Sequence, residues 1–302
     1  MRAGRASWTA EGVTFYRALE SARPETERGC YDPVAKEFLD TEFGLLYRNR
    51  LGRKIALLYL VHGSFAVSYF FVVSRTGYVD DRLKACIADG IRQLVILGAG
   101  FDTRAYRFDA MKDGVKVFEV DHPATQGVKL ARVEKMPGRR PAYVTYVPVD
   151  FEREKMERRL LDSGYDPGVK TLFIWEGVTT YLTAKAVDET LAFVAGNTGE
   201  GTSIVFTYAY MTPGTGAVWD GARKWQVAVL KIRGEPPIFG IEKGAVEAFL
   251  AERGLDLVED ISGQALAEKY VRSADTRRKP NMYNAVALAT VRAMHPGGAR
   301  DA

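Results

Sequence analysis

The stretch Leu94–Tyr106, LVILGAGFDTRAY, decides the fold, because an apolar run leads directly into Gly98-Ala99-Gly100. Two closely spaced glycines let backbone amides approach a ligand at the point where a helix begins. Thr103 stands where the dinucleotide-binding pattern GxGxxG has its third glycine, which weakens the helix–strand packing needed around a pyrophosphate. We therefore expect a strand, a turn and a helix that bind a nucleoside without a pyrophosphate.

Strands and helices alternate along the chain on both sides of this turn. Short β-branched runs bounded by Gly, Asp or Pro are each followed by a charged segment of helical length. The pattern predicts an α/β fold with a mostly parallel, seven-stranded sheet, helices on both faces and a ligand crevice at the carboxyl ends of the strands. The expected strands are Gln93–Leu97, Val115–Val120, Tyr143–Val149, Thr171–Trp175, Ser203–Tyr208, Leu255–Ile261 and Met282–Val291, and the expected crossover helices are Asp102–Asp109, Pro123–Glu134, Phe151–Ser163 and Thr183–Val194.

Acidic residues follow the second and third expected strands. Asp121 stands 21 residues after Gly100, where a carboxylate can accept hydrogen bonds from ribose hydroxyls. Asp150 and Phe151 place a carboxylate beside a ring, where an adenine edge and face could be bound. Each feature also has a purely structural explanation, because glycines shape turns and aspartates cap helices. Their combination favours a nucleoside site.

The chain divides into three parts by composition. Residues 1–90 are expected to form an N-terminal helical cap, residues 91–294 the α/β domain, and residues 295–302 a tail. The stretch 211–241 is punctuated by Gly and Pro, and we expect it to be an insertion that covers the crevice.

Composition excludes several classes of protein. The 302 residues include 47% hydrophobic and 26% charged residues, which excludes disordered, collagen-like and disulfide-scaffold chains. The net charge of +4 is too small to predict nucleic acid or an anionic membrane as the main partner. Two distant cysteines and three scattered histidines offer no metal-ligand spacing, so we expect metal-free chemistry. The first 20 residues lack the apolar core of a signal peptide, which predicts a cytoplasmic protein.

One apolar segment competes with this soluble interpretation. Ile55–Val73 contains 19 positions without a formal charge, which is long enough to cross a bilayer. It also contains His62, Gly63, Ser64 and Ser68, and the chain has no second segment of this kind. We expect a buried helix, broken near Gly63, and no membrane partner.

Six motifs occur along the chain in a fixed order: Asp32-Pro33, RTGYVDD at 75–81, LGAGFDTRAYRF, FEVDHP, VPVDFE and WEGVTTYL. In this combination the chain resembles the leucine carboxyl methyltransferase-like family of class I S-adenosylmethionine-dependent methyltransferases, over roughly residues 15–210. The resemblance implies a Rossmann-like class I methyltransferase fold and S-adenosyl-L-methionine as methyl donor, with S-adenosyl-L-homocysteine as product. It also implies that the apolar segment before Arg75 packs against the sheet.

The resemblance assigns roles to individual residues. Arg75 would pair with the methionine carboxylate of the cofactor, although an ion pair with Asp80 or Asp81 at the surface is the alternative. Asp121 would bind the ribose hydroxyls, and Glu176 would face the methionine ammonium group or the reacting centre. The full cofactor set is Arg23, Arg75, Gly98, Ala99, Gly100, Asp121, His122, Asp150, Phe151 and Glu176, and the catalytic candidates are Glu176 and Tyr181.

The methyl acceptor is expected to be a carboxylate of a small molecule, which becomes a methyl ester. A carboxylate is ionised near neutral pH and needs no strong base, whereas a phenol or amine would need one, with His122 as the nearby candidate. A protein C-terminus remains an alternative acceptor, and the sequence leaves the oligomeric state open. The candidate acceptor contacts are Tyr208, Tyr210, Arg223 and Lys224.

Two other functions compete. Tyr181 and Lys185 match the Tyr-x-x-x-Lys pair of short-chain dehydrogenases, which would make the chain a nicotinamide-dependent oxidoreductase. The tyrosine follows a strand rather than lying inside a long helix, which argues against that function. A binding module without activity is the second alternative, because a fold does not establish catalysis.

Overall fold

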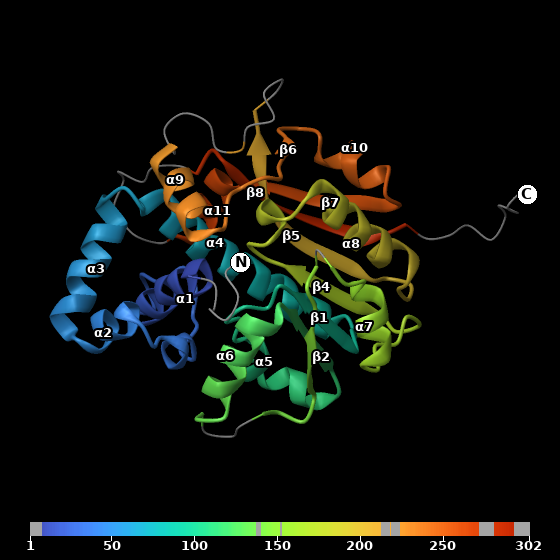
Figure 1. Ribbon diagram of the computed structural model, residues 1–302, viewed down its shortest axis with the longest axis horizontal. Helices are drawn as coiled ribbons and strands as arrows, with labels where there is room; N and C mark the ends of the chain where they lie inside the picture. Colours follow the sequence, from blue (N-terminus) through green and yellow to red (C-terminus); the bar gives the residue numbers. More distant parts are fainter. Residues whose placement is uncertain are drawn as a thin grey trace, which may run out of the picture.

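The sheet has the strand order β3-β2-β1-β4-β5-β8-β7, with the short β6 paired to β5 (Figure 1). The structure, a computed structural model, describes residues 8–136, 140–151, 153–212, 218, 224–271 and 281–292. Strands β1 to β5 are parallel, and β8 is antiparallel to both β5 and β7. The strands are β1 (Gln93–Leu97), β2 (Lys116–Asp121), β3 (Val144–Pro148), β4 (Thr171–Trp175), β5 (Ser203–Met211), β6 (Ile241–Glu242), β7 (Leu255–Ser262) and β8 (Asn284–Val291).

Alternating side chains of β1 face two separate hydrophobic layers. Val95 and Leu97 belong to one buried cluster, and Leu94 and Ile96 to another. The first cluster includes residues of α7, α8 and α10, and the second includes residues of α4, α5 and α11. This two-residue alternation, together with helices on both faces, confirms the predicted α/β architecture. The helices after β1 are α5 (Arg104–Arg107), η2 (Asp109–Asp113), α6 (Pro123–Val133), α7 (Met156–Asp162), η3 (Thr179–Tyr181), α8 (Ala184–Gly196), α9 (Lys224–Arg233), α10 (Val246–Ala251) and α11 (Gly263–Tyr270).

The structure corrects the sequence expectations at three places. The sheet has eight strands rather than seven, because the two-residue β6 joins the end of β5. Helix α7 begins at Met156 rather than Phe151, since residues 153 and 154 turn back to hydrogen-bond the carbonyl of Asp150. The helix expected over residues 102–109 is only one turn long and is followed by the 3-10 helix η2.

The N-terminal region forms a group of helices beside the sheet (Figure 1). It contains α1 (Trp8–Ser21), η1 (Ala35–Phe38), α2 (Glu42–Arg48), α3 (Arg50–His62) and α4 (Ala66–Ala88). Phe15, Leu19 and Phe70 share a buried cluster that joins α1 to α4. Phe71 and Tyr78 of α4 instead join the cluster on one face of the sheet, so α4 connects the cap to the α/β core.

The apolar segment Ile55–Val73 is broken where the sequence predicts. Helix α3 ends at His62, and α4 leaves at an angle of 98°. A Cβ at Gly63 would lie 2.3 Å from the carbonyl oxygen of Tyr59, so a side chain there would not fit without a shift. In the part of the chain that the structure describes, no single helix is long and apolar enough to span a bilayer; only the bent α3–α4 pair meets that test of length and composition.

Candidate active site

A large cavity lies at the carboxyl ends of β1, β2, β3 and β4, where a parallel sheet places its ligands. Its volume is about 1030 Å³, at the upper end of ordinary ligand pockets. Helices α1, α3 and α4 line one part of it, and the segment Val229–Ile238 lines another. The cavity therefore has room for two ligands side by side.

The glycine turn after β1 forms the floor of this cavity. Gly98 and Gly100 have φ values of 63° and 47°, in the left-handed region that glycine adopts without strain. A Cβ at Gly98 would lie 2.4 Å from Cγ2 of Val178. Gly98, Ala99 and Gly100 all line the cavity. The glycines thus create a backbone cradle that a side chain would fill.

Asp121 fixes this turn and lines the cavity. Its Oδ2 atom accepts a hydrogen bond of 2.6 Å from the Gly100 amide, and its Oδ1 atom accepts one of 2.7 Å from the His122 amide. Burial raises the pKa of Asp121, although both amide donors oppose the shift. Each carboxylate oxygen retains a lone pair, so the group can still accept hydrogen bonds from a ribose.

The third strand adds Asp150 and Phe151 to the lining. Nε2 of His122 lies 3.9 Å from Oδ2 of Asp150, and Nδ1 of His122 accepts a hydrogen bond from the Ala124 amide and caps α6. A carboxylate and a ring at this position match what an adenine needs. The position of His122 at the start of α6 explains its presence as a capping residue.

Arg75 and Glu176 meet across 101 positions of sequence. Nε of Arg75 donates a 2.9 Å hydrogen bond to Oε1 of Glu176, and both residues line the cavity. Arg75 is 8% exposed, so the alternative of a surface ion pair with Asp80 or Asp81 is wrong. A Cβ at Gly177 would lie 2.8 Å from a terminal nitrogen of Arg75, so this glycine provides the space that the guanidinium occupies.

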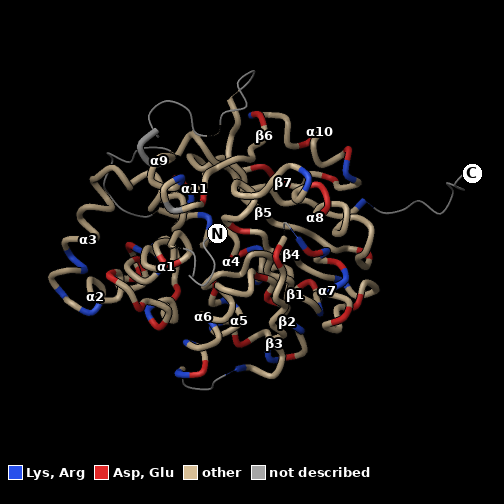
Figure 2. The backbone as a smooth tube through the Cα atoms, viewed as in Figure 1, with Lys and Arg blue, Asp and Glu red and all other residues tan. Residues whose placement is uncertain are grey.

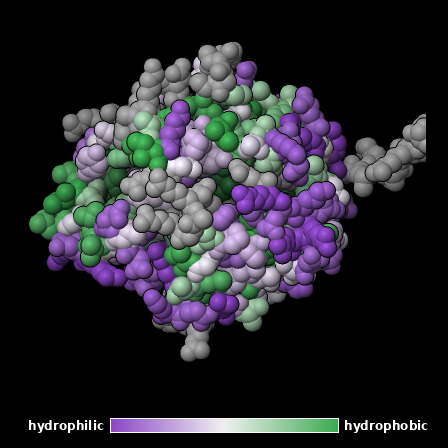
Figure 3. Space-filling view, viewed as in Figure 1, coloured by the Kyte–Doolittle hydropathy of each residue, from purple (hydrophilic) through white to green (hydrophobic). Residues whose placement is uncertain are grey.

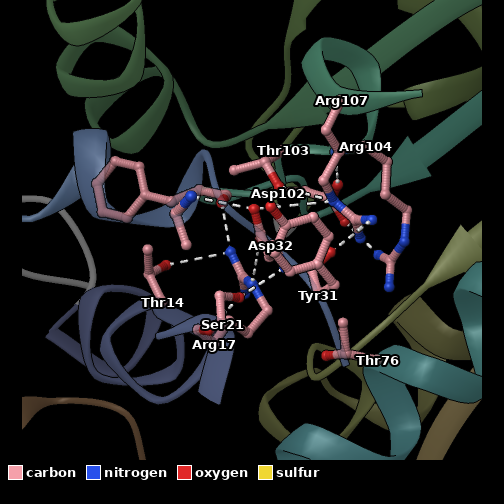
Figure 4. A network of polar contacts seen from close by, with 12 residues as sticks. Thr14, Arg17, Ser21, Tyr31, Asp32, Thr76, Asp102, Thr103, Arg104 and Arg107 are labelled. Atoms are coloured by element: carbon pink, nitrogen blue, oxygen red, sulfur yellow. Dashed lines mark hydrogen bonds and ion pairs between the residues drawn. The ribbon is translucent and has the colours of Figure 1, made fainter. Parts of the chain in front are cut away.

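A buried network of alternating charges supports this pair, and Figure 4 shows the part of it around Arg17, Asp32 and Arg104. Arg104 donates 2.8 Å hydrogen bonds to Oδ1 of Asp80 and Oε2 of Glu176, and it also contacts Asp102. Arg107 pairs with Asp80 at 2.7 Å and lies 3.8 Å from Asp32. The four arginines of the network are Arg17, Arg75, Arg104 and Arg107, and the four carboxylates are Asp32, Asp80, Asp102 and Glu176.

Arg17 extends the network to the N-terminal helix. Its Nε atom pairs with Asp32 at 2.8 Å, and a terminal nitrogen donates to the carbonyl oxygen of Phe101, next to the glycine turn. Arg17 also lines the cavity. The sequence analysis missed Arg17, Arg104, Arg107 and Asp102 as site residues. The motif DTRAYRF contained three of them, whereas nothing near Arg17 in the sequence marked it.

The arginines of the network keep Glu176 and Asp102 ionised. Burial would raise the pKa of Glu176, but Arg104 and Arg75 outweigh it and hold the pKa below its usual range. The same balance, with Arg104 as the main partner, lowers the pKa of Asp102 to about 2. Glu176 is therefore a fixed negative charge rather than an acid or base at neutral pH.

A family model for leucine carboxyl methyltransferases matches residues 10–195. The chain belongs to the leucine carboxyl methyltransferase family. A Bacillus subtilis protein provisionally named an S-adenosyl-L-methionine-dependent methyltransferase is 30% identical over 210 residues, which cover 70% of this chain and 67% of that protein. A Streptomyces avermitilis protein with the same provisional description is 35% identical over 206 residues, or 66% of this chain and 68% of its own.

Two solved structures resemble the fold of this methyltransferase. A DUF574 family protein from Streptomyces avermitilis has a TM-score of 0.55 at 14% identity and covers 93% of this chain and 97% of its own. A Thermobifida fusca structure, provisionally described as a methyltransferase, has a TM-score of 0.57 at 14% identity and covers 97% of each chain. At this identity the similarity confirms the Rossmann-like class I fold alone.

The chain is therefore a methyltransferase that uses S-adenosyl-L-methionine, as the motifs predict. The family assignment removes the nicotinamide-dependent alternative. Lys185 also fails the geometry of that alternative, since its side chain is 82% exposed and lies 3.8 Å from Glu189. Tyr181 follows β4 on η3 and lines the cavity.

Several predicted site residues lie elsewhere. Arg23 is absent from the cavity lining, because its guanidinium pairs with Glu20 and Glu27 at 3.2 Å each. Tyr208 is fully buried and hydrogen-bonds Asp260, and Tyr210 packs edge-on against it; neither lines the cavity. Arg223 lies outside the described residues, and so does the side chain of Lys224, the first residue of α9. Of the four predicted acceptor contacts, the structure therefore removes Tyr208 and Tyr210 from the cavity lining.

Proposed function

We propose that this methyltransferase esterifies a carboxylate of a small molecule. The observation that carries the proposal is that the acidic groups beside the expected reacting centre are committed to arginines. Among the described residues that line the cavity, Glu176 and Asp102 are bound by Arg75 and Arg104, and His122 caps α6. A carboxylate acceptor is already ionised at neutral pH and needs no proton acceptor.

The residues fit the cofactor as follows. The glycine cradle and Asp121 would hold the ribose, and Asp150 with Phe151 would hold the adenine. Arg75 would bind the methionine carboxylate with its terminal nitrogens, since its Nε atom already donates to Glu176. Glu176 would face the ammonium group. When bound, S-adenosyl-L-methionine supplies a methyl group activated by a sulfonium.

The reaction needs alignment more than proton transfer. In the proposed reaction an oxygen of the acceptor carboxylate would attack the methyl carbon, and the bond between that carbon and sulfur would break, with its electron pair remaining on sulfur. No proton is released or taken up. The charge network holds Arg75 and Glu176 in place before binding, so the chain contributes orientation at attack distance.

A panel of acceptors tests the proposal. Purified protein is incubated with S-adenosyl-L-methionine and carboxylic acids, phenols, amines or peptides with a free C-terminus, and methylated products are identified by mass spectrometry. Methyl esters of small acids are expected, with a rate that stays flat from about pH 6 to 9, because the acceptor pKa lies near 4. A rate that rises with pH on phenols or amines would contradict the proposal, and selective esterification of peptides would assign a protein acceptor.

Two variants test the cofactor contacts by calorimetry. Arg75→Ala is expected to weaken binding of S-adenosyl-L-homocysteine by on the order of 2–4 kcal/mol, the scale for removing one partner of a buried charge pair. Asp121→Ala should weaken S-adenosyl-L-methionine and S-adenosyl-L-homocysteine by the same factor, because both share the ribose. Unchanged affinity in the first variant, or a loss confined to one ligand in the second, would overturn these roles.

A further inference from the structure

The cavity has a second arm that the cofactor contacts do not use. Its walls are apolar side chains of the helical cap. They include Val13 of α1, Phe43 of α2, Ala56 and Leu60 of α3, and Val72 of α4. In the part of the chain that the structure describes, α2 and α3 contribute no charged side chain to this lining. A polar metabolite would gain little in such an arm.

The arm opens onto an apolar surface of α2 and α3. Leu46, Ile55 and Tyr59 line the cavity and are nevertheless 43%, 59% and 54% exposed. We call these three residues the entrance. Figure 3 shows hydrophobic side chains gathered at the left edge of the molecule, over α3. Exposed apolar side chains that continue into a cavity are typical of a ligand entrance rather than of an inert surface.

The charge around the entrance is positive. From Phe43 to Val79 the chain contains no Asp or Glu, whereas it carries Arg48, Arg50, Arg53, Lys54 and Arg75. Figure 2 shows basic residues on the tube at α2 and α3. Arg48, Arg50 and Lys54 are exposed, and Arg75 lies in the cavity. The exposed basic side chains attract an anion to the entrance.

We propose that the acceptor is an amphipathic carboxylic acid whose apolar body lies in this arm. The inference rests on the proposed carboxylate esterification and specifies its substrate class. The apolar body enters over Leu46, Ile55 and Tyr59 and packs against Leu60 and Val72. The carboxylate then lies at the inner end, toward the methionine side of the cofactor site near Arg75. An acid dissolved in water and one carried in a lipid bilayer share this chemistry.

A chain-length series measures the arm directly. The rate of ester formation from straight-chain acids between butanoate and dodecanoate gives kcat/KM for each length. We expect kcat/KM to rise roughly three- to fourfold with each added methylene until the arm is full, the increment expected for burying one such group. Equal values for butanoate and dodecanoate would overturn the inference while leaving esterification intact.

Pairs of substitutions, one in the cavity lining and one at an exposed position outside it, test whether the arm causes the dependence of kcat/KM on chain length. Ile55→Asp should lower kcat/KM at least tenfold more for dodecanoate than for butanoate, because the added charge repels both anions but only the longer chain packs against Ile55. Leu58→Asp is the control, since Leu58 is 63% exposed on the same helix but does not line the cavity. Ala56→Phe should shorten the longest acid accepted, and Ala85→Phe, at an exposed position of α4 outside the cavity, should not. Equal effects of Ile55→Asp and Leu58→Asp would contradict the proposed entrance.

A binding experiment separates the two proposals. Calorimetry with dodecanoate and S-adenosyl-L-homocysteine needs no turnover. If no acid is esterified but dodecanoate binds to wild type and not to Ile55→Asp, the proposed acceptor arm is supported and the proposed carboxylate esterification is refuted. If dodecanoate does not bind to the wild-type protein, the proposed acceptor arm is refuted.

The source of the acid is tested with hexadecanoate in phosphatidylcholine vesicles. If the rate of ester formation increases in proportion to the surface area of the vesicles, the enzyme takes the acid from the bilayer. If the rate increases in proportion to the concentration of dissolved acid, the enzyme takes it from water.

Discussion

The two ends of the cavity are built on opposite principles. The cofactor end consists of backbone turns and buried charges, each fixed by a specific partner, as in the Asp121–Gly100 and Arg75–Glu176 contacts. The acceptor arm consists of apolar side chains from the four helices α1 to α4, with partial exposure at Leu46, Ile55 and Tyr59. A site built from hydrogen bonds and ion pairs of fixed geometry recognises one ligand, whereas an apolar arm selects ligands by their size and hydrophobicity. The comparison suggests that the cofactor end tolerates few substitutions and the arm many.

The sharpest test of the cofactor end is Arg104→Met. The substitution leaves Asp80, Asp102 and Glu176 without their shared cation, and removal of one partner from a buried charge cluster costs about 3–5 kcal/mol. We expect a loss of that size in the free energy of unfolding in urea, and loss of S-adenosyl-L-homocysteine binding at temperatures where the variant stays folded. Lys185→Ala removes only an exposed contact with Glu189 and should change neither. Similar unfolding curves for the two variants would show that the network is not structural.

The corresponding test of the arm is Leu60→Ala. Leu60 is 5% exposed and touches the cavity, so its truncation should cost about 2 kcal/mol, the lower end for a buried leucine. Cofactor affinity measured by calorimetry should stay at the wild-type value, because Leu60 belongs to the cap cluster. A parallel loss of cofactor affinity would mean that the two ends are coupled.

Gly177→Ala should affect binding more than folding. Its φ of 75° already disfavours a side chain, and the added methyl would press on the guanidinium of Arg75. We expect S-adenosyl-L-homocysteine affinity to fall about tenfold, or about 1.4 kcal/mol. Gly127→Ala in α6 is the control, because its Cβ meets nothing within 4 Å and alanine favours a helix. Equal cofactor affinity in both variants would refute the steric role of Gly177.

The last prediction concerns Glu119, two residues before Asp121 on β2. Burial raises the pKa of Glu119 to about 7, although Lys129, 2.6 Å away, opposes the shift. The folded state therefore holds a proton that the unfolded state releases near pH 4.3, so the free energy of unfolding falls as pH rises from about 5 to 7. Glu119→Gln should flatten that slope in urea titrations at several pH values. A slope that persists in the variant would assign the effect to another group.

Much of the cofactor end was predictable because its signals are local. The glycine turn, Asp121 and Asp150 each follow a strand, and the carboxyl ends of parallel strands converge on one edge. Arg75 and Glu176 were identified by resemblance, but their direct contact was not. Arg23 was taken from the resemblance, and only the packing of α1 shows that Arg17 reaches the glycine turn while Arg23 pairs with Glu20.

The sequence by itself determined the alternation of strands and helices, the turn at Gly98–Gly100, the break near Gly63 and the methyltransferase family, since each depends on neighbouring residues or on motif order. Only the tertiary structure decided the acceptor arm and the charge network. Asp32 joins Arg17 to Arg107, and Asp80 joins Arg107 to Arg104. Ile55 lines the cavity from α3, which is bent by 98° relative to α4. These contacts join residues far apart in the sequence, and packing rather than local pattern determines which of them come together.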